Sequence, residues 1–371
     1  MLPLVEKRVF ELAEFRTFHG AKIRDLRVGW EAYGEMNADK SNVILICHYF
    51  TGTSHAAGKY ADCDLEPGYW DAIIGPGKAV DTDKYCVISV DSLANINAYD
   101  PNVTTAGPAS RDPATGAPYG MRFPIVTIRD FVEVQRALLD SLGVGRLHAV
   151  MGPSMGALQT YEWAAAHPER LGRIVPVIGG GWASADLIAR LNIWGAPIRL
   201  DPDWRGGDYY DGAPPRAGLI ESLKLITHDA LHQDWAEAAF GRNWAEATRD
   251  PAADHDHLFA VEAALEAAAR DRALLMDANH LLYLAKANQL FFAGHEGDLY
   301  DGLRRAAAPA LIVYQPKDRV FHAELVEKTA AILREKAGAA LFPLEGSHGH
   351  LDGIYSIAQA ADAIREFLAR P

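Results

Sequence analysis

Residues 148–167 read HAVMGPSMGALQTYEWAAAH, and this stretch decides the fold. An apolar strand runs into the turn GPSMG (152–156), and a helix follows directly. This is a G-x-S-x-G motif in a strand–turn–helix setting, which exposes its serine on a sharp turn above a sheet edge. Glycines at both ends of the turn avoid clashes with the neighbouring backbone. The stretch predicts a nucleophilic Ser154 at the positive end of a helix, and a glycine-rich turn with an incidental serine is the alternative.

Short apolar runs elsewhere in the chain are typical of strands buried on both faces of a sheet. Helical patterns follow them at residues 128–142, 323–336 and 354–368, the last of which predicts a closing amphipathic helix. This alternation predicts a mostly parallel sheet with helices on both faces. In residues 4–33, two alternating segments about a turn at His19-Gly20 predict an antiparallel hairpin at the sheet edge. The apolar runs are NVILIC (42–47), YCVISV (85–90), RIVPVI (173–178), ALIVY (310–314) and ALFPL (340–344).

The pattern changes after the strand at 173–178. Residues 182–305 show Ala-rich helical periodicity and contain no strand-like run. We interpret residues 181–305 as a helical lid that is inserted over the carboxyl edge of the sheet. The core domain then comprises residues 1–180 and 306–371.

A serine becomes a nucleophile when a base takes its proton, and the base needs an acid to orient it. The partners are expected on loops at the carboxyl ends of late strands. The strand ALIVY runs into QPKD, which ends at Asp318, and the next strand runs into EGSHGH (345–350). Asp318 is therefore the predicted acid. His348 and His350 both remain candidates for the base, because spacing alone does not separate them.

Acyl transfer also needs donors directed at the developing oxyanion. The backbone N–H of Met155, just after the serine, is one predicted donor. The second is expected from the loop HYFTG (48–52), and we assign it to the Phe50 amide, with Thr51 beside it. A plain strand-to-loop turn is the alternative for this loop. The long polar excursion from Ser92 to Pro124 is also expected to carry function, because long loops inside compact domains usually do.

Composition narrows the class of protein. The formal net charge of −13 argues against a nucleic-acid partner, which requires clustered Lys and Arg. No apolar run approaches the length of a membrane span, and the N-terminus carries charges where a signal peptide would be apolar. Three cysteines favour free thiols and a cytoplasmic location. DHDH (254–257) predicts a solvated helix face rather than a metal site, because alternate residues on a helix point apart.

Several of these motifs resemble the homoserine O-acetyltransferase family of the α/β-hydrolase superfamily. The resemblance covers most of the chain and implies an α/β-hydrolase fold with an inserted helical lid. The similar segments are HYFTG (48–52), residues 105–144, GPSMGALQTYEWAAAHPERL (152–171), LDPDWRGGDYY (200–210), DANHLLYLAKA (277–287), YQPKD (314–318) and GHLDG (349–353).

Carried over at matching positions, the resemblance implies Ser154 as nucleophile, Asp318 as orienting acid and His350 as base. His350 is preferred because its Gly-His pair fits the family pattern. The amides of Phe50 and Met155 would form the oxyanion hole. The resemblance also implies a ping-pong reaction without a bound cofactor, in which an acyl group passes from acetyl-CoA or another acyl-CoA to serine and then to a small hydroxyl acceptor. Family members are typically homodimers that pack through lid helices.

The chain departs from this family where the acceptor is recognised. Gly195 and Ala196 stand where the family has an Arg-Gln pair, whose arginine binds the substrate carboxylate, and a neutral side chain does not replace it. Leu351 stands where an aspartate follows the catalytic histidine, and Asp352 is one place late. The elbow reads GPSMGA instead of GGSMGG. Tyr209, the lid tyrosine, is retained as a substrate contact.

Together these features predict a Ser-His-Asp acyl-transfer enzyme that is not specific for homoserine. The first hypothesis is an acyltransferase with another alcohol or amine acceptor. The second is a hydrolase of an ester, thioester or amide, which uses the same residues with water as acceptor. A non-catalytic scaffold is the third, and the complete set of triad residues argues against it.

Overall fold

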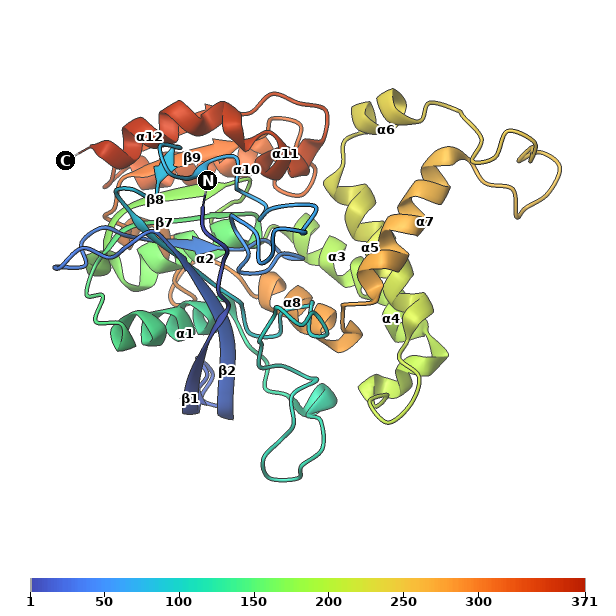
Figure 1. Cartoon of the computed structure of the whole chain (residues 1–371), viewed down its shortest axis with the longest axis horizontal. Helices are drawn as coiled ribbons and strands as arrows, with labels where there is room; N and C mark the ends of the chain where they lie inside the picture. Colours follow the sequence, from blue (N-terminus) through green and yellow to red (C-terminus); the bar gives the residue numbers. More distant parts are fainter. Residues whose placement is uncertain (1, 371) are drawn as a thin grey trace.

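The computed structural model describes residues 2–370, and its centre is an eight-stranded sheet (Figure 1). The first two strand pairs of the sheet are antiparallel, and all later neighbours run parallel. A separate two-stranded pair joins β4 (Ile74–Gly75) to β5 (Val80–Asp81). In spatial order the large sheet contains β1 (Arg8–Arg16), β2 (Lys22–Tyr33), β6 (Cys86–Val90), β3 (Val43–Cys47), β7 (Leu147–Pro153), β8 (Leu171–Val177), β9 (Ala310–Tyr314) and β10 (Ala339–Pro343).

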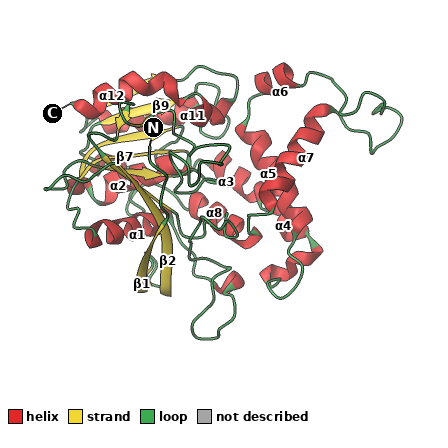
Figure 2. Ribbon diagram, in the orientation of Figure 1, coloured by secondary structure: helices red, strands yellow, loops and turns green. Residues whose placement is uncertain are grey.

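Helices cover both faces of this sheet (Figure 2). Successive side chains of a strand point to opposite faces. In β3, Val43 and Leu45 therefore pack in the hydrophobic cluster that contains α1, α2 and α10, whereas Ile44 and Ile46 pack in the cluster that contains α12. The predicted mostly parallel, doubly covered sheet is confirmed. The core helices are α1 (Ile128–Ser141), α2 (Met155–Ala166), α10 (Ala323–Arg334) and α12 (Ala361–Ala369).

The predicted hairpin at the sheet edge is also confirmed. β1 and β2 pair antiparallel, with Arg16 opposite Lys22 at the turn. The N–H of Thr17 donates to the carbonyl of Ala21 at 2.8 Å and closes the connection.

The segment between β8 and β9 is helical, and α4 to α7 project away from the sheet (Figure 1). α5 packs on α4 and α7, and α3 packs on α8. In the described chain its only β pairing is two isolated bridges, at Trp182 with Phe292 and at Trp244 with Phe259. Its helices are α3 (Ala185–Trp194), α4 (Ala196–Leu200), α5 (Arg216–Ala230), α6 (Gln233–Ala239), α7 (Ala260–Ala273), α8 (Ala278–Gln289) and α9 (Asp301–Arg305).

Asp277, the N-terminal cap of α8, ties this helical segment to the core. Its carboxylate accepts hydrogen bonds from the hydroxyls of Tyr99 at 2.8 Å, Tyr209 at 2.9 Å and Tyr210 at 3.2 Å. Tyr99 belongs to the long polar excursion of the core, whereas Tyr209 and Tyr210 belong to the inserted segment. One buried carboxylate thus joins three segments that are far apart in the sequence.

Two local predictions are wrong. Residues 354–368 do not form one helix, because the chain breaks into α11 (Asp352–Tyr355), a 3-10 turn at Ile357–Ala360 and α12. The break lies at Ser356, whose N–H and hydroxyl both bond back to Asp352. Residues 254–257 lie in an exposed turn before α7 and not on a helix, because the Asp254 carboxylate accepts the N–H of Asp256.

Among residues 2–370, no group of three or more His, Cys, Asp or Glu side chains is arranged to hold a metal ion. Within the same residues, no helix combines the length and the hydropathy that a membrane crossing requires.

Candidate active site

The turn between β7 and α2 holds Ser154 in a strained backbone conformation. Its φ of 56° and ψ of −117° are rare for a residue with a side chain. The Ser154 N–H donates to Val177 of β8 at 2.9 Å, which fixes the turn against the sheet. A Cβ at Gly152 or Gly156 would lie only 2.4 or 2.1 Å from the carbonyl oxygen of Cys47. Only glycine fits at both positions, so the turn lies close against β3 and presents Ser154 above it.

Three side chains from separate loops meet at this turn. The Oγ of Ser154 lies 2.8 Å from Nε2 of His350, and Nδ1 of His350 lies 2.7 Å from Oδ2 of Asp318. All three residues are buried. Because a carboxylate only accepts hydrogen bonds, Nδ1 of His350 carries a proton and Nε2 is free to take the proton of Ser154. This is the arrangement in which an imidazole acts as a general base toward serine.

Asp318 is held in place by the backbone. Its Oδ1 accepts the N–H groups of Val320 at 2.7 Å and Phe321 at 3.0 Å, while Oδ2 remains directed at His350. The loop after β9 therefore satisfies one carboxylate oxygen and aims the other at the base. Phe321 also stacks on the imidazole of His350, with ring centroids 5.9 Å apart.

His348, the other histidine of the loop after β10, lies apart from this arrangement. Its side chain is 36% exposed, and its Nδ1 lies 3.4 Å from Oδ1 of Asp352. Asp352 is itself buried and accepts a hydrogen bond from Gln315 at 2.7 Å. The geometry therefore brings His350, and not His348, to the serine.

The loop that carries Phe50 lies beside the serine. Phe50 is buried, and its ring packs edge-on against Trp194 of α3 at a centroid distance of 5.7 Å. Neither the N–H of Phe50 nor that of Met155 donates a hydrogen bond to an acceptor in residues 2–370. Both amides are thus available to an incoming oxygen. Thr51 lines the same cavity as Ser154.

His48 holds the start of this loop as a neutral imidazole. Its Nδ1 lies 2.7 Å from the carbonyl oxygen of Tyr49, and its Nε2 accepts the N–H of Ser92 at 3.0 Å. Nδ1 must carry the proton, because a carbonyl oxygen only accepts. Burial lowers the pKa of His48 to about 4, and the charge of Lys7 acts in the same direction. These contacts give His48 a structural role in the loop.

Two asparagines that the sequence analysis missed also hold this loop. Asn95 Nδ2 donates to the carbonyl of Gly52 at 3.1 Å, and Asn97 Nδ2 donates to the carbonyl of Thr51 at 3.1 Å. Both belong to the excursion that was expected to carry function. Its length was the available signal, because nothing in its pattern singles out these two residues.

Buried charges lie behind the loop. Lys7 Nζ is 2.8 Å from Glu31 Oε1, and the Asp91 carboxylate accepts the N–H of Ser54 at 2.8 Å. Burial opposes the charge of Glu31, but hydrogen bonds from His55 and Lys7 outweigh it and lower the pKa of Glu31 to about 2. The opposite holds for Asp91, whose pKa is raised because burial outweighs its partners. Ser54, just after the loop, is therefore anchored by hydrogen bonds to Glu31 of β2 and to Asp91, the residue after β6.

The cavity next to Ser154 is small and apolar. Its volume is about 60 Å³, which is room for about two water molecules at liquid density. The described residues supply no Arg, Lys, Asp or Glu side chain to its wall. Its lining residues are Tyr49, Phe50, Thr51, Ser154, Leu187, Leu191, Trp194, Ile226, Ala230, Asn288, Val320, Phe321, His350 and Leu351.

Other positions singled out from the sequence lie elsewhere or contribute no charge. Tyr209 does not line this cavity, because its buried hydroxyl donates to Asp277, so its expected role as a substrate contact lacks a geometric basis. Gly195 caps the end of α3 against Leu282. Leu351 does line the cavity, whereas Asp352 does not.

The chain is similar to several known proteins. A family model described as the alpha/beta hydrolase fold matches residues 42–348. The homoserine O-acetyltransferase of Methanococcoides burtonii is 37% identical over 357 residues, which are 96% of this chain and 72% of that protein. The crystal structure of esterase E22 is 48% identical, has a TM-score of 0.94 and covers 98% of this chain and 100% of its own. The homoserine O-acetyltransferase structure from Bacillus anthracis is 35% identical, with a TM-score of 0.94, and covers 99% of this chain and 98% of its own.

The site and the fold agree with these matches. Ser154 lies on a strained turn within reach of a histidine–aspartate pair, and the strands of the sheet follow the order given above. The chain is a member of the α/β-hydrolase fold family and, within it, an enzyme that resembles the homoserine O-acetyltransferases.

Proposed function

We propose that this enzyme is a serine esterase that hydrolyses esters of short acyl groups, with water as the final acceptor. The observation that carries the proposal is the wall of the cavity at Ser154, to which the described residues contribute no Arg, Lys, Asp or Glu side chain. An amino acid such as homoserine would bring a carboxylate and an ammonium group into this space. Burying such charges without partners costs several kcal/mol. A neutral ester carries no such cost.

Three arginines near the cavity are engaged elsewhere. Arg190 on α3 pairs with Asp186 at 3.1 Å and with Asp229 at 2.9 Å. Arg272 on α7 donates to the Thr227 hydroxyl at 2.5 Å and to backbone carbonyls. Arg199 is exposed and donates to Asn192. None of these three lines the cavity, so none serves as the carboxylate clamp of an amino-acid acceptor.

In the proposed reaction, the Oγ of Ser154 attacks the ester carbonyl carbon while Nε2 of His350 takes the hydroxyl proton. The N–H groups of Phe50 and Met155 stabilise the oxyanion, which forms as the C=O bond becomes single. The ester C–O bond then breaks, and His350, paired with Asp318, gives its proton to the oxygen of the leaving alcohol. The alcohol departs, and the acyl group remains on Ser154. Water attacks this ester with His350 as base, and the acid and free serine are released.

Two comparisons support the choice of water over another acceptor. Esterase E22, at 48% identity, is named for ester cleavage. The positions where the family arginine and aspartate recognise the acceptor are Gly195 and Leu351 here. A second candidate is transfer of an acyl group, from an ester or an acyl-CoA, to a neutral alcohol. It is supported by the 37% identity to a homoserine O-acetyltransferase over nearly the whole chain.

The dependence of turnover on an added acceptor separates these candidates. The enzyme is incubated with p-nitrophenyl acetate or with acetyl-CoA, each alone, with homoserine and with a neutral alcohol. An esterase releases nitrophenolate at a rate that no acceptor changes, and it does not release CoA. Thiol release that depends on homoserine would refute the proposal, and product transfer to the neutral alcohol would favour the second candidate.

We also propose that the enzyme is a homodimer that packs through its lid helices. Large apolar side chains are exposed on this part of the surface, with Leu200 82%, Leu274 63% and Ile193 54% exposed. Light scattering should give twice the chain mass, and Leu200→Lys should shift it toward the monomer. A wild-type mass equal to one chain would refute this.

A further inference from the structure

Of the described residues, Asn288 on α8 alone contributes a side-chain amide to the cavity wall. The residue is only 5% exposed and yet lines the same small cavity as Ser154. Most of its neighbours in the wall are apolar, including Leu187, Leu191 and Ile226. A polar group in such a wall orients the ligand, because few other groups there can do so.

The orientation of the amide follows from its one hydrogen bond. Asn288 Nδ2 donates to the carbonyl oxygen of Leu284, one helical turn earlier, at 2.8 Å. A carbonyl oxygen accepts only, so the atom that faces it is the nitrogen, and Oδ1 points the other way.

The oxygen faces the cavity. In residues 2–370, Asn288 Oδ1 accepts no hydrogen bond, yet it is not one of the fully enclosed polar atoms that lack a partner. Part of its surface is therefore accessible. Because the residue is buried and lines the cavity, we assign that accessible surface to the cavity. An uncharged acceptor is thus presented to whatever occupies the space beside Ser154.

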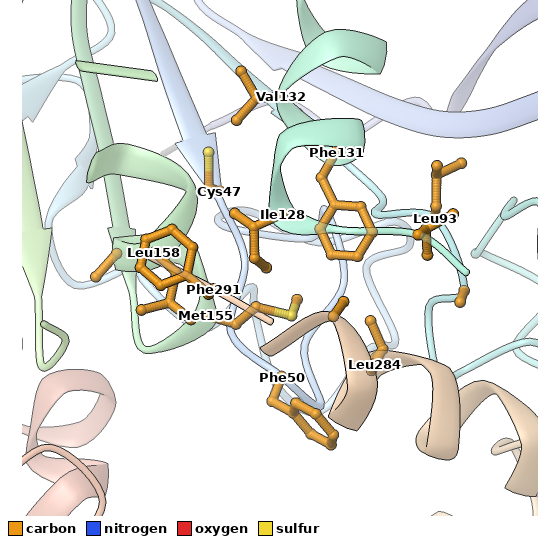
Figure 3. Packing of buried hydrophobic residues seen from close by; sticks show 14 of the residues in the cluster. Cys47, Phe50, Leu93, Ile128, Phe131, Val132, Met155, Leu158, Leu284 and Phe291 are labelled. Atoms are coloured by element: carbon orange, nitrogen blue, oxygen red, sulfur yellow. The ribbon is translucent and has the colours of Figure 1, made fainter. Parts of the chain in front are cut away.

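The neighbours of Asn288 place it on the acyl side of the reaction. Figure 3 shows Leu284 and Phe291, which lie on either side of Asn288 along the chain, in the same region of the core as Phe50 and Met155. The amides of Phe50 and Met155 are the proposed oxyanion donors, so we take Asn288 to lie toward the carbonyl end of the substrate. The alcohol instead leaves toward His350, which takes part in its protonation.

We propose that Asn288 is a specificity-determining residue that accepts a hydrogen bond from a hydroxyl group on the acyl chain. This rests on the proposed esterase function and narrows it, because the preferred substrates become esters of short 2- or 3-hydroxy acids. An apolar acyl chain of the same shape leaves the buried oxygen unpaired, which disfavours its binding. The hydroxyl supplies the missing donor.

Two pairs of neutral esters test this directly. In each pair a hydroxyl is replaced by a methyl group, as in ethyl 2-hydroxypropanoate against ethyl 2-methylpropanoate, and ethyl 3-hydroxybutanoate against ethyl 3-methylbutanoate. The measured quantity is the ratio of kcat/KM within a pair, for the wild type and for Asn288→Leu and Asn288→Ala. Each ratio is independent of the amount of folded enzyme. Comparison with the variants removes the difference in intrinsic ester reactivity.

We expect the preference for the hydroxy ester in at least one pair to fall about five-fold in both variants, which corresponds to about 1 kcal/mol for one neutral hydrogen bond. The matched control Leu187→Met alters the shape of the same wall without removing an acceptor, and its ratios should stay at the wild-type values. A third pair, 2-hydroxyethyl acetate against propyl acetate, carries the hydroxyl on the alcohol and should show no change.

Ratios that are unchanged in both Asn288 variants would overturn the inference while leaving the esterase function intact. A change confined to the third pair would also overturn it, because the acceptor would then serve the alcohol side. Failure of the wild type to hydrolyse any of these esters would overturn the proposed function, and this inference with it.

Discussion

Replacing His48 by Gln should flatten the acid dependence of stability. His48 is fully buried, and its pKa is lowered from 6.5 to about 4. Near pH 5 its imidazole is therefore protonated in the unfolded chain and neutral in the folded protein. The free energy of unfolding therefore decreases as pH falls below 6.5, until both states are protonated below about pH 4. Between pH 7 and pH 5 this one group removes about 2 kcal/mol.

Urea unfolding followed by tryptophan fluorescence at a series of pH values measures this effect. The wild-type free energy of unfolding should fall by about 2 kcal/mol more than that of His48→Gln over this interval. At pH 7 the variant should be less stable, because it loses the hydrogen-bond geometry to Tyr49 and Ser92. His255→Gln is the matched control, since His255 is exposed in the turn before α7. It should keep the wild-type dependence.

A His48→Gln enzyme with the wild-type dependence on pH would refute this reasoning, because His48 would then not be the neutral scaffold of the Phe50 loop. The same variant tests the link to catalysis. Displacement of the Phe50 amide should lower kcat for acetyl esters by up to about 100-fold.

Three further perturbations test the site and its supports. His350→Ala should lower kcat/KM for esters by about 10⁴-fold or more, whereas His348→Ala should retain most of it; the reverse result would overturn the base assignment. Gly156→Ala should abolish soluble expression, because its Cβ would lie 2.1 Å from the Cys47 carbonyl oxygen, and a stable variant with wild-type Tm would contradict that packing. Asp277→Ala leaves three tyrosine hydroxyls without their acceptor and should destabilise the protein by about 3 kcal/mol in urea; a change below about 0.5 kcal/mol would contradict its anchoring role.

The sequence predicts those parts of the site that are placed by regular secondary structure. Ser154 follows from a strand–turn–helix motif, and Asp318 follows from the rule that loops at the carboxyl ends of parallel strands meet. The choice between His348 and His350 does not follow from spacing. Gly349 between them has a φ of +62°, and this turn directs the two side chains differently. Family resemblance, not local pattern, favoured His350.

The rest depends on contacts between loops that have no periodicity. Asn95 and Asn97 support the Phe50 loop from more than 40 residues away, through hydrogen bonds to backbone carbonyls. Tyr209 was expected near the substrate, but the structure pairs its hydroxyl with Asp277, 68 positions later. Such partners depend on the path of the loop backbone in space, which a single sequence does not encode in any regular pattern. Asn288 was missed for the same reason. Its proposed role depends on the position of α8 in the cavity wall, which the sequence pattern does not predict.

In the proposed reaction, Ser154 carries the acyl group and passes it to water. Enzyme mixed with p-nitrophenyl acetate, quenched in acid within the first turnovers and digested, can be analysed by mass spectrometry of the peptide around the GPSMG turn. We predict one acetyl group on Ser154, its absence in Ser154→Ala, and a rate of loss that homoserine does not change. An acetyl group on another residue, an active Ser154→Ala enzyme, or loss that requires homoserine would contradict the account.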